Sequence, residues 1–153
     1  MLKRLFTIVT VSLLISGCAK NGTKEVSLDG YDELKLSRAK ELYACSSFFR
    51  IVGSQRKNQE EIDRYNNFTK QAKQLGNDLI KAAGKDPSSL DWRVVNSLYK
   101  NGDQQAVQMI ISIGKDKSGV KFKETTISCY ELVKKEEFFA NVGVLNKRLN
   151  KEK

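Results

Sequence analysis

The first seventeen residues constrain this chain most, because they decide in which compartment the rest of it folds. Lys3 and Arg4 form a short positive segment, Leu5 to Ile15 is an uncharged apolar run, and the small residues Ser16 and Gly17 follow. This order is typical of a secretory signal peptide. The apolar run is shorter than the roughly 20 residues that span a bilayer. We therefore expect residues 1–17 to direct export, as a cleaved signal or as a short uncleaved anchor.

The end of this segment, Ile15-Ser16-Gly17-Cys18, resembles a bacterial lipobox. The resemblance implies that the signal is cut before Cys18, that the cysteine thiol receives a diacylglyceryl group and that the new amino terminus is acylated, commonly with palmitate. Two acyl chains suffice for stable membrane anchoring. Ala19 stands where enteric inner-membrane lipoproteins carry Asp. The resemblance therefore implies the periplasmic face of the outer membrane, in preference to the inner membrane.

Two further cysteines, Cys45 and Cys129, remain once Cys18 is assigned to the lipid. An even pair in an oxidising compartment predicts a disulfide, and the alternative is two buried free thiols. A disulfide between Cys45 and Cys129 would close a long loop of the chain. By the chain-entropy model, such a bond raises the free energy of unfolding by roughly 4–5 kcal/mol at most. The sequence has no Cys-x-x-Cys motif, so we expect a structural pair instead of a redox-active one.

The exported part divides into a polar tether at residues 18–31 and a helical domain at residues 32–150. Apolar residues recur every three or four positions through most of the domain, which predicts helices. Asn58, followed three positions later by Glu61, predicts the N-terminal cap of the second helix. We expect Asn101-Gly102 to interrupt the third helix and Val120 to Lys123 to form a short strand or loop before the last helix. The prediction is an all-α, four- to five-helix antiparallel bundle, with the disulfide joining the first and last major helices.

Composition excludes most catalytic chemistry. The chain has no histidine, which excludes histidine-based triads, histidine general bases and histidine-containing metal sites. The adjacent carboxylates Glu60-Glu61 and Glu136-Glu137 point in different directions on a helix, so neither pair can act on one bond. We expect no catalytic residue, no metal, no cofactor and no enzymatic activity.

The net charge of +9 is compatible with two interpretations. A basic protein can bind polyanions such as lipid head groups or an acidic protein. Alternatively, the basic residues are the solvated surface of the helices, because they are spread along the chain. Export removes nucleic acid from the expected partners and leaves the membrane, through the lipid, and a protein of the cell envelope.

Aromatic pairs lie near both cysteines of the predicted disulfide. One interpretation is core packing around the bond, and we expect Phe139 and Val142 to continue the buried stripe that contains Cys129. The other is that adjacent residues cannot both point inward, so that part of each pair is exposed and forms a hydrophobic groove for a partner. The candidate groove residues are Phe48, Phe49, Phe138 and Phe139.

The segments Cys45-Ser46-Ser47-Phe48-Phe49 and Ile127-Ser128-Cys129-Tyr130 resemble those of small, mostly uncharacterised helical periplasmic proteins of proteobacteria, which carry one cysteine in the first helix and one in the last. The leading hypothesis is a membrane-anchored, non-enzymatic helical interaction module. A concrete version is similar in architecture to pilotins, the small outer-membrane lipoproteins that carry secretin subunits outward. The alternative is an exclusion or immunity lipoprotein of phage or plasmid type.

Overall fold

The computed structural model describes residues 26–84, 86 and 89–149, with the side chains of 144–149 excepted. These residues form four helices and no strand, which confirms the all-α prediction. The predicted signal peptide, Cys18, Pro87 and the start of the tether lie outside the described residues. The helices, in chain order, are α1 at Glu33–Ser54, α2 at Gln59–Ala83, α3 at Trp92–Lys115 and α4 at Val120–Leu149.

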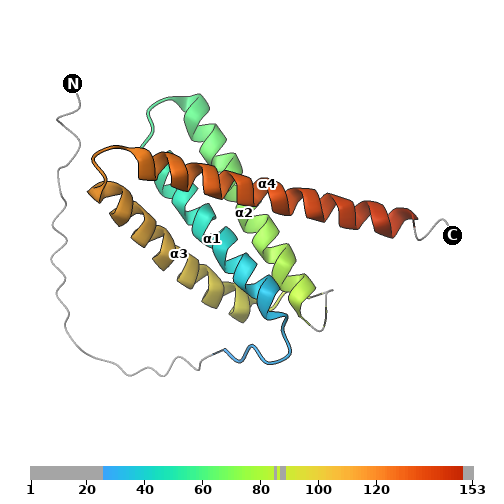
Figure 1. Ribbon diagram of the computed structural model, residues 1–153. Helices are drawn as coiled ribbons and strands as arrows, with labels where there is room; N and C mark the ends of the chain where they lie inside the picture. The colour runs from blue at the N-terminus through green and yellow to red at the C-terminus, as the bar shows by residue number, and fades with distance from the viewer. Residues whose placement is uncertain (1–25, 85, 87–88, 150–153) are drawn as a thin grey trace, which may run out of the picture.

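Helix α1 is the centre of the fold. It lies between α2, which is antiparallel to it, and α3, which is parallel to it, while α4 crosses one side of this layer and extends beyond it (Figure 1). All eight consecutive residues from Leu42 to Phe49 are buried. A helix buried around its whole circumference must be covered on every side, and three neighbouring helices provide that cover.

The core has two clusters along α1. One surrounds the disulfide and contains Leu42, Cys45, Phe48, Phe49, Val52, Ala72, Ala106, Cys129 and Val133. The other lies at the opposite end of α1 and contains Leu36, Ala39, Tyr43, Ile80, Ala83, Val94, Val95 and Leu98. Val26 and Tyr31, at the end of the predicted tether, pack against the second cluster, so ordered packing begins before the predicted domain boundary at residue 32.

Three polar side chains of α1 that lie in the core form hydrogen bonds, as most buried polar groups do. Ser46 Oγ donates to the backbone oxygen of Thr69 at 3.0 Å, and Ser47 Oγ donates to the carboxylate of Asp103. Tyr43 donates its hydroxyl to the side chain of Asn77 at 2.7 Å, and burial raises the Tyr43 pKa above its usual value. These bonds join α1 to α2 and α3, so they add directional constraints to an otherwise apolar interface.

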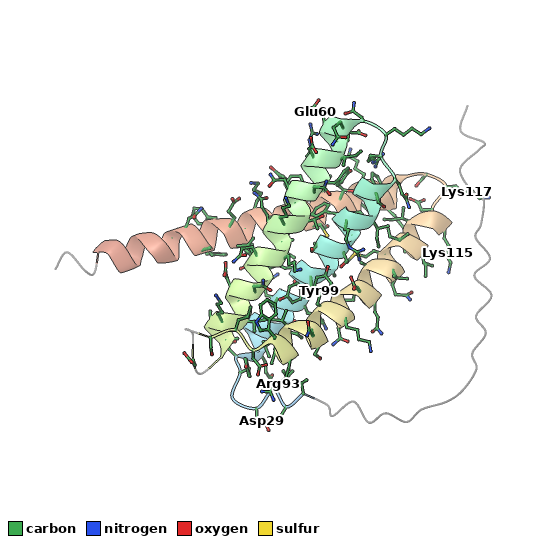
Figure 2. The ribbon with its side chains drawn as sticks, turned by 180° about the vertical axis from the view of Figure 1, so that it is seen from behind. Asp29, Glu60, Arg93, Tyr99, Lys115 and Lys117 are labelled. Carbon is green, nitrogen blue, oxygen red and sulfur yellow. A yellow bond between two sulfur atoms is a disulfide. The ribbon has the colours of Figure 1, made fainter. Side chains whose placement is uncertain are left out.

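Tyr99 connects three helices on the side seen in Figure 2. It belongs to α3, its ring centroid lies 5.2 Å from that of Tyr43 in an edge-on arrangement, and Lys73 Nζ of α2 lies 5.3 Å from its ring centroid. Edge-on aromatic pairs and cations over aromatic rings are both favourable. The tyrosine therefore joins α2 and α3, which otherwise pack mainly on α1.

Side-chain caps set the beginnings of three helices. Asp32, Asn58 and Asp91 precede α1, α2 and α3, and each accepts a hydrogen bond from a backbone N–H of the first turn. Such residues satisfy N–H groups that have no partner within the helix. The Asn58 cap was expected from the sequence and is confirmed.

Two local predictions are wrong. Helix α3 runs without interruption through Asn101 and Gly102, because Gly102 is the point at which α3 packs closely against α1: a Cβ there would lie 2.7 Å from the Tyr43 Cβ. The predicted strand at Val120 to Lys123 is the first turn of α4. Its loop, with Gly119 at a φ of 75°, leads directly into the helix. In the described ranges, no helix has the length and apolarity required to cross a bilayer.

Candidate interaction surface

The predicted disulfide is present between α1 and α4. The two sulfur atoms of Cys45 and Cys129 are 2.06 Å apart and their Cα atoms are 5.3 Å apart. Both cysteines are buried, with exposed fractions of 4% and 2%. The bond therefore fixes the first third of α4 to the core, and this attachment restricts the direction in which α4 leaves the bundle.

The first half of α4 packs inward. Phe122 packs on Phe48 of α1, Cys129 forms the disulfide, and Val133 is fully buried. Phe122, Cys129 and Val133 are separated by seven and four positions, which places them on one face of a helix. This face is the one by which α4 is held against the other helices.

In the second half of α4, the large apolar residues leave the face that packs inward. A helix turns about 100° per residue, so Phe138 and Val142 lie roughly 180° away from the face of Cys129 and Val133, and Phe139 lies about 100° away from that face, on the flank of the helix. Phe138 is 63% exposed and Phe139 is 54% exposed, with their ring centroids 5.9 Å apart. We call Phe138, Phe139 and Val142 the outward patch. These residues follow Glu137, the position at which α4 crosses α2, and after this crossing α4 extends beyond the other helices (Figure 1).

This arrangement corrects the predicted groove and the predicted stripe. Phe48 and Phe49 are both buried, with exposed fractions of 0% and 1%, because α1 is covered on every side; neither can line a surface. Phe139 does not continue the buried stripe of Cys129. The four candidate residues therefore do not come together, and only Phe138 and Phe139 are available to a partner.

The base of the extending segment is held by ionic contacts. Glu136 Oε1 lies 3.4 Å from Arg38 Nε of α1, and Lys134 Nζ donates to Glu137 Oε2 at 2.8 Å. The hydrogen bond to Glu137 raises the Lys134 pKa, so the ammonium group stays charged. Each carboxylate of Glu136-Glu137 is therefore paired with a cation, Glu136 with Arg38 and Glu137 with Lys134.

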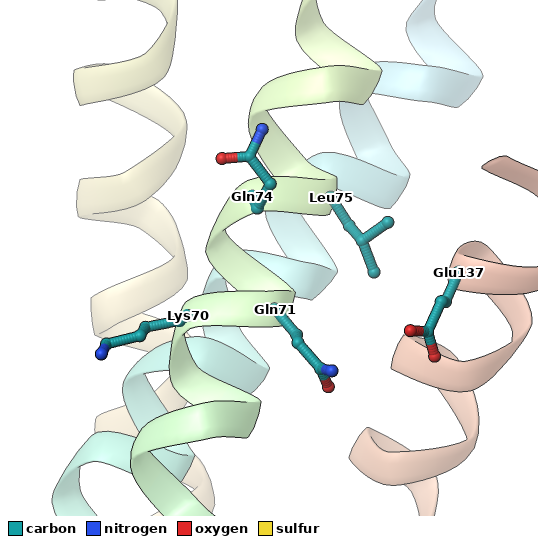
Figure 3. Close-up of a pocket in the computed structure, with 5 residues that line it drawn as sticks. All are labelled: Lys70, Gln71, Gln74, Leu75 and Glu137. Carbon is teal, nitrogen blue, oxygen red and sulfur yellow. The ribbon is translucent and has the colours of Figure 1, made fainter. Parts of the chain in front are cut away.

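A shallow pocket of about 380 Å³ lies where α4 crosses α2, next to this base. Figure 3 shows Gln71 of α2 directed toward Glu137 of α4, with Leu75 beside them. Gln71 Oε1 is buried without a hydrogen-bond partner among the described residues. The lining consists of two amide side chains, one aliphatic side chain, the Lys70 ammonium group and the Glu137 carboxylate, which is paired with Lys134.

A second pocket of about 460 Å³ lies over the disulfide, between α1, α3 and α4. Its floor includes Cys45, Cys129, Met109 and Leu132, and its rim carries polar and charged side chains. The rim residues are Arg38, Glu41, Gln105, Glu124, Thr125 and Ser128. In the part of the chain that the structure describes, no group of three histidine, cysteine or carboxylate side chains could hold a metal ion.

Sequence reasoning named Phe138 and Phe139 as candidate surface residues but missed the change of face along α4, although a signal for it exists. Val133 is followed by four charged residues, Lys134 to Glu137, and the next apolar residue is Phe138. Phe138 lies five positions after Val133, about 140° away around the helix, so it cannot continue the same apolar face.

Comparisons with known proteins add no relative. Scans of protein-family profiles, curated proteins and solved structures each found no match to this chain.

Proposed function

We propose that this protein is a lipid-anchored, non-enzymatic interaction module of the bacterial cell envelope, and that the outward patch on α4 is its contact with a protein partner. The anchor is Cys18 of the lipobox-like segment, and the expected address is the periplasmic face of the outer membrane. A pilotin-like assembly chaperone is the concrete form that we favour.

The observation that carries this proposal is the reversal of the apolar face along α4. Exposed apolar residues are common on proteins, but here two adjacent exposed phenylalanines lie next to a partly buried valine in one patch. Their own bundle cannot cover the patch, because it lies on the other side of the helix. Clustered exposed apolar side chains that are surrounded by charge mark interaction sites. Aromatic residues are also the side chains most enriched in the centres of protein interfaces.

The disulfide supports the same interpretation. It fixes α4 at Cys129, nine positions before Phe138, so the patch is presented in one orientation. A rigid contact surface loses less conformational entropy on binding than a flexible one. Attachment of the whole module to a membrane raises the effective concentration of any partner in the same membrane.

The test is crosslinking in intact cells followed by mass spectrometry. Four chains are compared: the parent, Cys18→Ala, the double variant Phe138→Asp/Phe139→Asp, and Ala140→Asp. Ala140 is exposed on the same segment but on the opposite face, so its variant controls for added charge. We expect a crosslinked envelope protein in the parent and in Ala140→Asp, and its loss in the other two. A crosslink that is unaffected by the double variant would contradict the proposed contact.

Membrane fractionation of the same cells tests the anchor separately. Cys18→Ala should move from the membrane fraction to the soluble fraction, while its disulfide and helix content stay unchanged. If this variant still sediments with membranes, the lipid anchor is wrong.

A further inference from the structure

One end of the bundle concentrates positive charge. The loop from α1 to α2 and the loop from α3 to α4 lie at this end, and residues 55–58 and 115–123 hold six cations against one carboxylate, that of Asp116. We call these six cations the basic end: Arg56, Lys57, Lys115, Lys117, Lys121 and Lys123. Among the described residues, none of the six forms an ion pair. Their charge is therefore available to a partner outside the bundle.

Arg56 holds a fixed place in the basic end. Its guanidinium carbon lies 5.5 Å from the ring centroid of Tyr65 in α2 and 5.4 Å from that of Phe122 in α4. Its Nε atom is buried without a hydrogen-bond partner among the described residues. The two rings thus bring the two loops together and position a cation that has no carboxylate beside it.

The other four arginines whose side chains are described differ from Arg56. Arg38, Arg50, Arg64 and Arg93 each contact a carboxylate, at 3.0 to 3.4 Å. The aromatic rings attract the charge of Arg56, but its terminal N–H groups donate to no described residue. A planar guanidinium matches the oxygens of a phosphate group with two parallel hydrogen bonds. The geometry of Arg56 therefore fits an oxyanion.

The opposite end of the bundle has the reverse balance of charge. Residues 26–36 and 89–93, at the starts of α1 and α3, hold four carboxylates and two cations. Both cations are paired with carboxylates of the same end. Figure 2 shows Asp29 and Arg93 at this end, and Lys115 and Lys117 away from it. An anionic surface therefore attracts the basic end and repels the other end, which orients the molecule.

The loop before α4 adds an apolar contact to the basic end. Val120 lies between Lys117 and Lys121 in the sequence and is 52% exposed. A membrane surface presents phosphate groups to cations and, directly below them, an apolar boundary to a side chain of this kind. A free phosphate ion offers only the first. An exposed valine among lysines therefore favours a lipid surface.

We infer that the basic end is a second contact surface of this protein and that it binds the anionic phospholipid head groups of a membrane, with Arg56 on a phosphate group and the lysines around it. Phe138 lies sixteen positions after Phe122, about 24 Å along α4 at 1.5 Å per residue. Lipid contact at the basic end therefore leaves the outward patch free for a protein. The inference rests on the proposed function in one respect, because the anchor at Cys18 keeps the basic end beside a bilayer.

The test places a donor dye on the full-length, lipid-anchored protein in vesicles. Gln55→Cys carries the dye beside Arg56, and Asn96→Cys carries it on α3 toward the opposite end; both native side chains are exposed. The vesicles contain phosphatidylcholine alone, or phosphatidylcholine and phosphatidylglycerol in equal parts, with an acceptor dye on a trace of the head groups. We expect energy transfer from Gln55→Cys to rise with phosphatidylglycerol and to return in high salt to its level in phosphatidylcholine. Transfer from Asn96→Cys should not rise.

Equal transfer from Gln55→Cys in the two kinds of vesicle would overturn the inference, and so would a rise from Asn96→Cys alone. Inorganic phosphate that lowers the transfer more than sodium chloride of the same ionic strength would overturn the bilayer in favour of a small phosphate ion. Flotation of the vesicles separates this result from the anchor. A protein that floats only with phosphatidylglycerol would contradict the anchor and support the basic end, whereas one that floats with both and shows equal transfer would support the anchor and overturn the inference.

Matched charge variants test whether the basic end acts as a site. Lys57→Gln/Lys117→Gln removes two of its six cations, and Lys70→Gln/Lys100→Gln removes the same charge from exposed positions of α2 and α3. The first variant should lose roughly a third or more of the rise in transfer, and the second should keep it, with the same helix content in both. Equal losses would show that net charge alone acts, and would overturn the site. No rise, together with a crosslink from Gln55 to an acidic envelope protein, would overturn the lipid surface in favour of that protein.

Discussion

Arg38 of α1 and Glu136 of α4 lie side by side, with 3.4 Å between Nε and Oε1, at the point where α4 leaves the bundle. The Glu136 side chain is only 12% exposed, whereas that of Arg38 is 35% exposed. A carboxylate this far from water needs a charged partner. The ion pair and the disulfide therefore have the same effect: both connect α1 to α4 and fix the direction of α4 relative to α1.

Replacing Arg38 by Met should lower the free energy of unfolding by about 1–2 kcal/mol, because it leaves Glu136 partly buried without its partner. Adding Glu136→Gln to this variant should restore part of the loss. Urea unfolding of the single and double variants measures both effects. Glu41 is the matched control: it also accepts from Arg38, at 3.0 Å, but is 46% exposed, so Glu41→Gln should cost less than about 1 kcal/mol. Equal stability of the single and double variants would show that the two side chains are not coupled.

Removing the disulfide should destabilise the protein by about 2–5 kcal/mol, since the bond between Cys45 and Cys129 closes a loop of 84 positions. The double variant Cys45→Ala/Cys129→Ala avoids an unpaired thiol in the core, and its Tm should fall by at least about 5 °C. Reduction of the parent protein should lower its Tm in the same direction. If the oxidised protein, the reduced protein and the double variant melt together, the bond contributes nothing to stability.

The path of the chain was predictable where the signal is local. Apolar residues at helical spacing, the Asn58 cap and an even pair of cysteines after a predicted export signal predict the helices and the bond between α1 and α4, and the structure confirms the helices, the cap and the bond. The failures concern tertiary contacts. Asn101-Gly102 was expected to break α3, because glycine lowers helix propensity. In the fold, the missing side chain is instead what allows α3 to approach α1.

Only half of the predicted candidate surface was correct, and the cause is again a tertiary contact. An adjacent aromatic pair on a helix implies that one ring points outward, unless neighbouring helices cover the whole circumference. Phe48 and Phe49 lie in the central helix and are both covered, whereas Phe138 and Phe139 lie beyond the bundle and are both exposed. Which case applies depends on where the neighbouring helices end, and the sequence near each pair does not specify this.

The close contact at Gly102 can be tested with a matched pair of glycine substitutions. A Cβ at Gly102 would lie 2.7 Å from the Tyr43 Cβ and 2.8 Å from the Ala44 backbone nitrogen. Gly102→Ala should therefore push α3 away from α1 and cost about 1–3 kcal/mol. Gly143 also lies within a helix, but among the described residues no neighbouring atom lies within 4 Å of its Cβ position, so Gly143→Ala should leave stability equal or slightly higher. Denaturant unfolding compares the two variants, and equal effects would mean that the helices separate at no cost.

Asp116 should make the stability of the protein depend on pH in the acid range. Its carboxylate accepts hydrogen bonds from Ser118 Oγ at 2.6 Å and from the Lys121 backbone nitrogen at 2.8 Å, at the start of α4. These bonds, that of the Ser118 side chain first, lower the Asp116 pKa to about 2 from the usual 3.8. A group whose pKa is lower in the folded state stabilises the fold above its unfolded pKa, and this contribution is lost as pH falls through the folded value.

We therefore expect the free energy of unfolding to fall between about pH 4 and pH 2, and to fall less in Asp116→Asn, which cannot lose a charge. Asp32 and Asp91, whose pKa values are also lowered, titrate in both proteins, so the difference between the two urea-unfolding profiles isolates Asp116. Parallel profiles down to pH 2 would show that the Asp116 charge does not stabilise the start of α4.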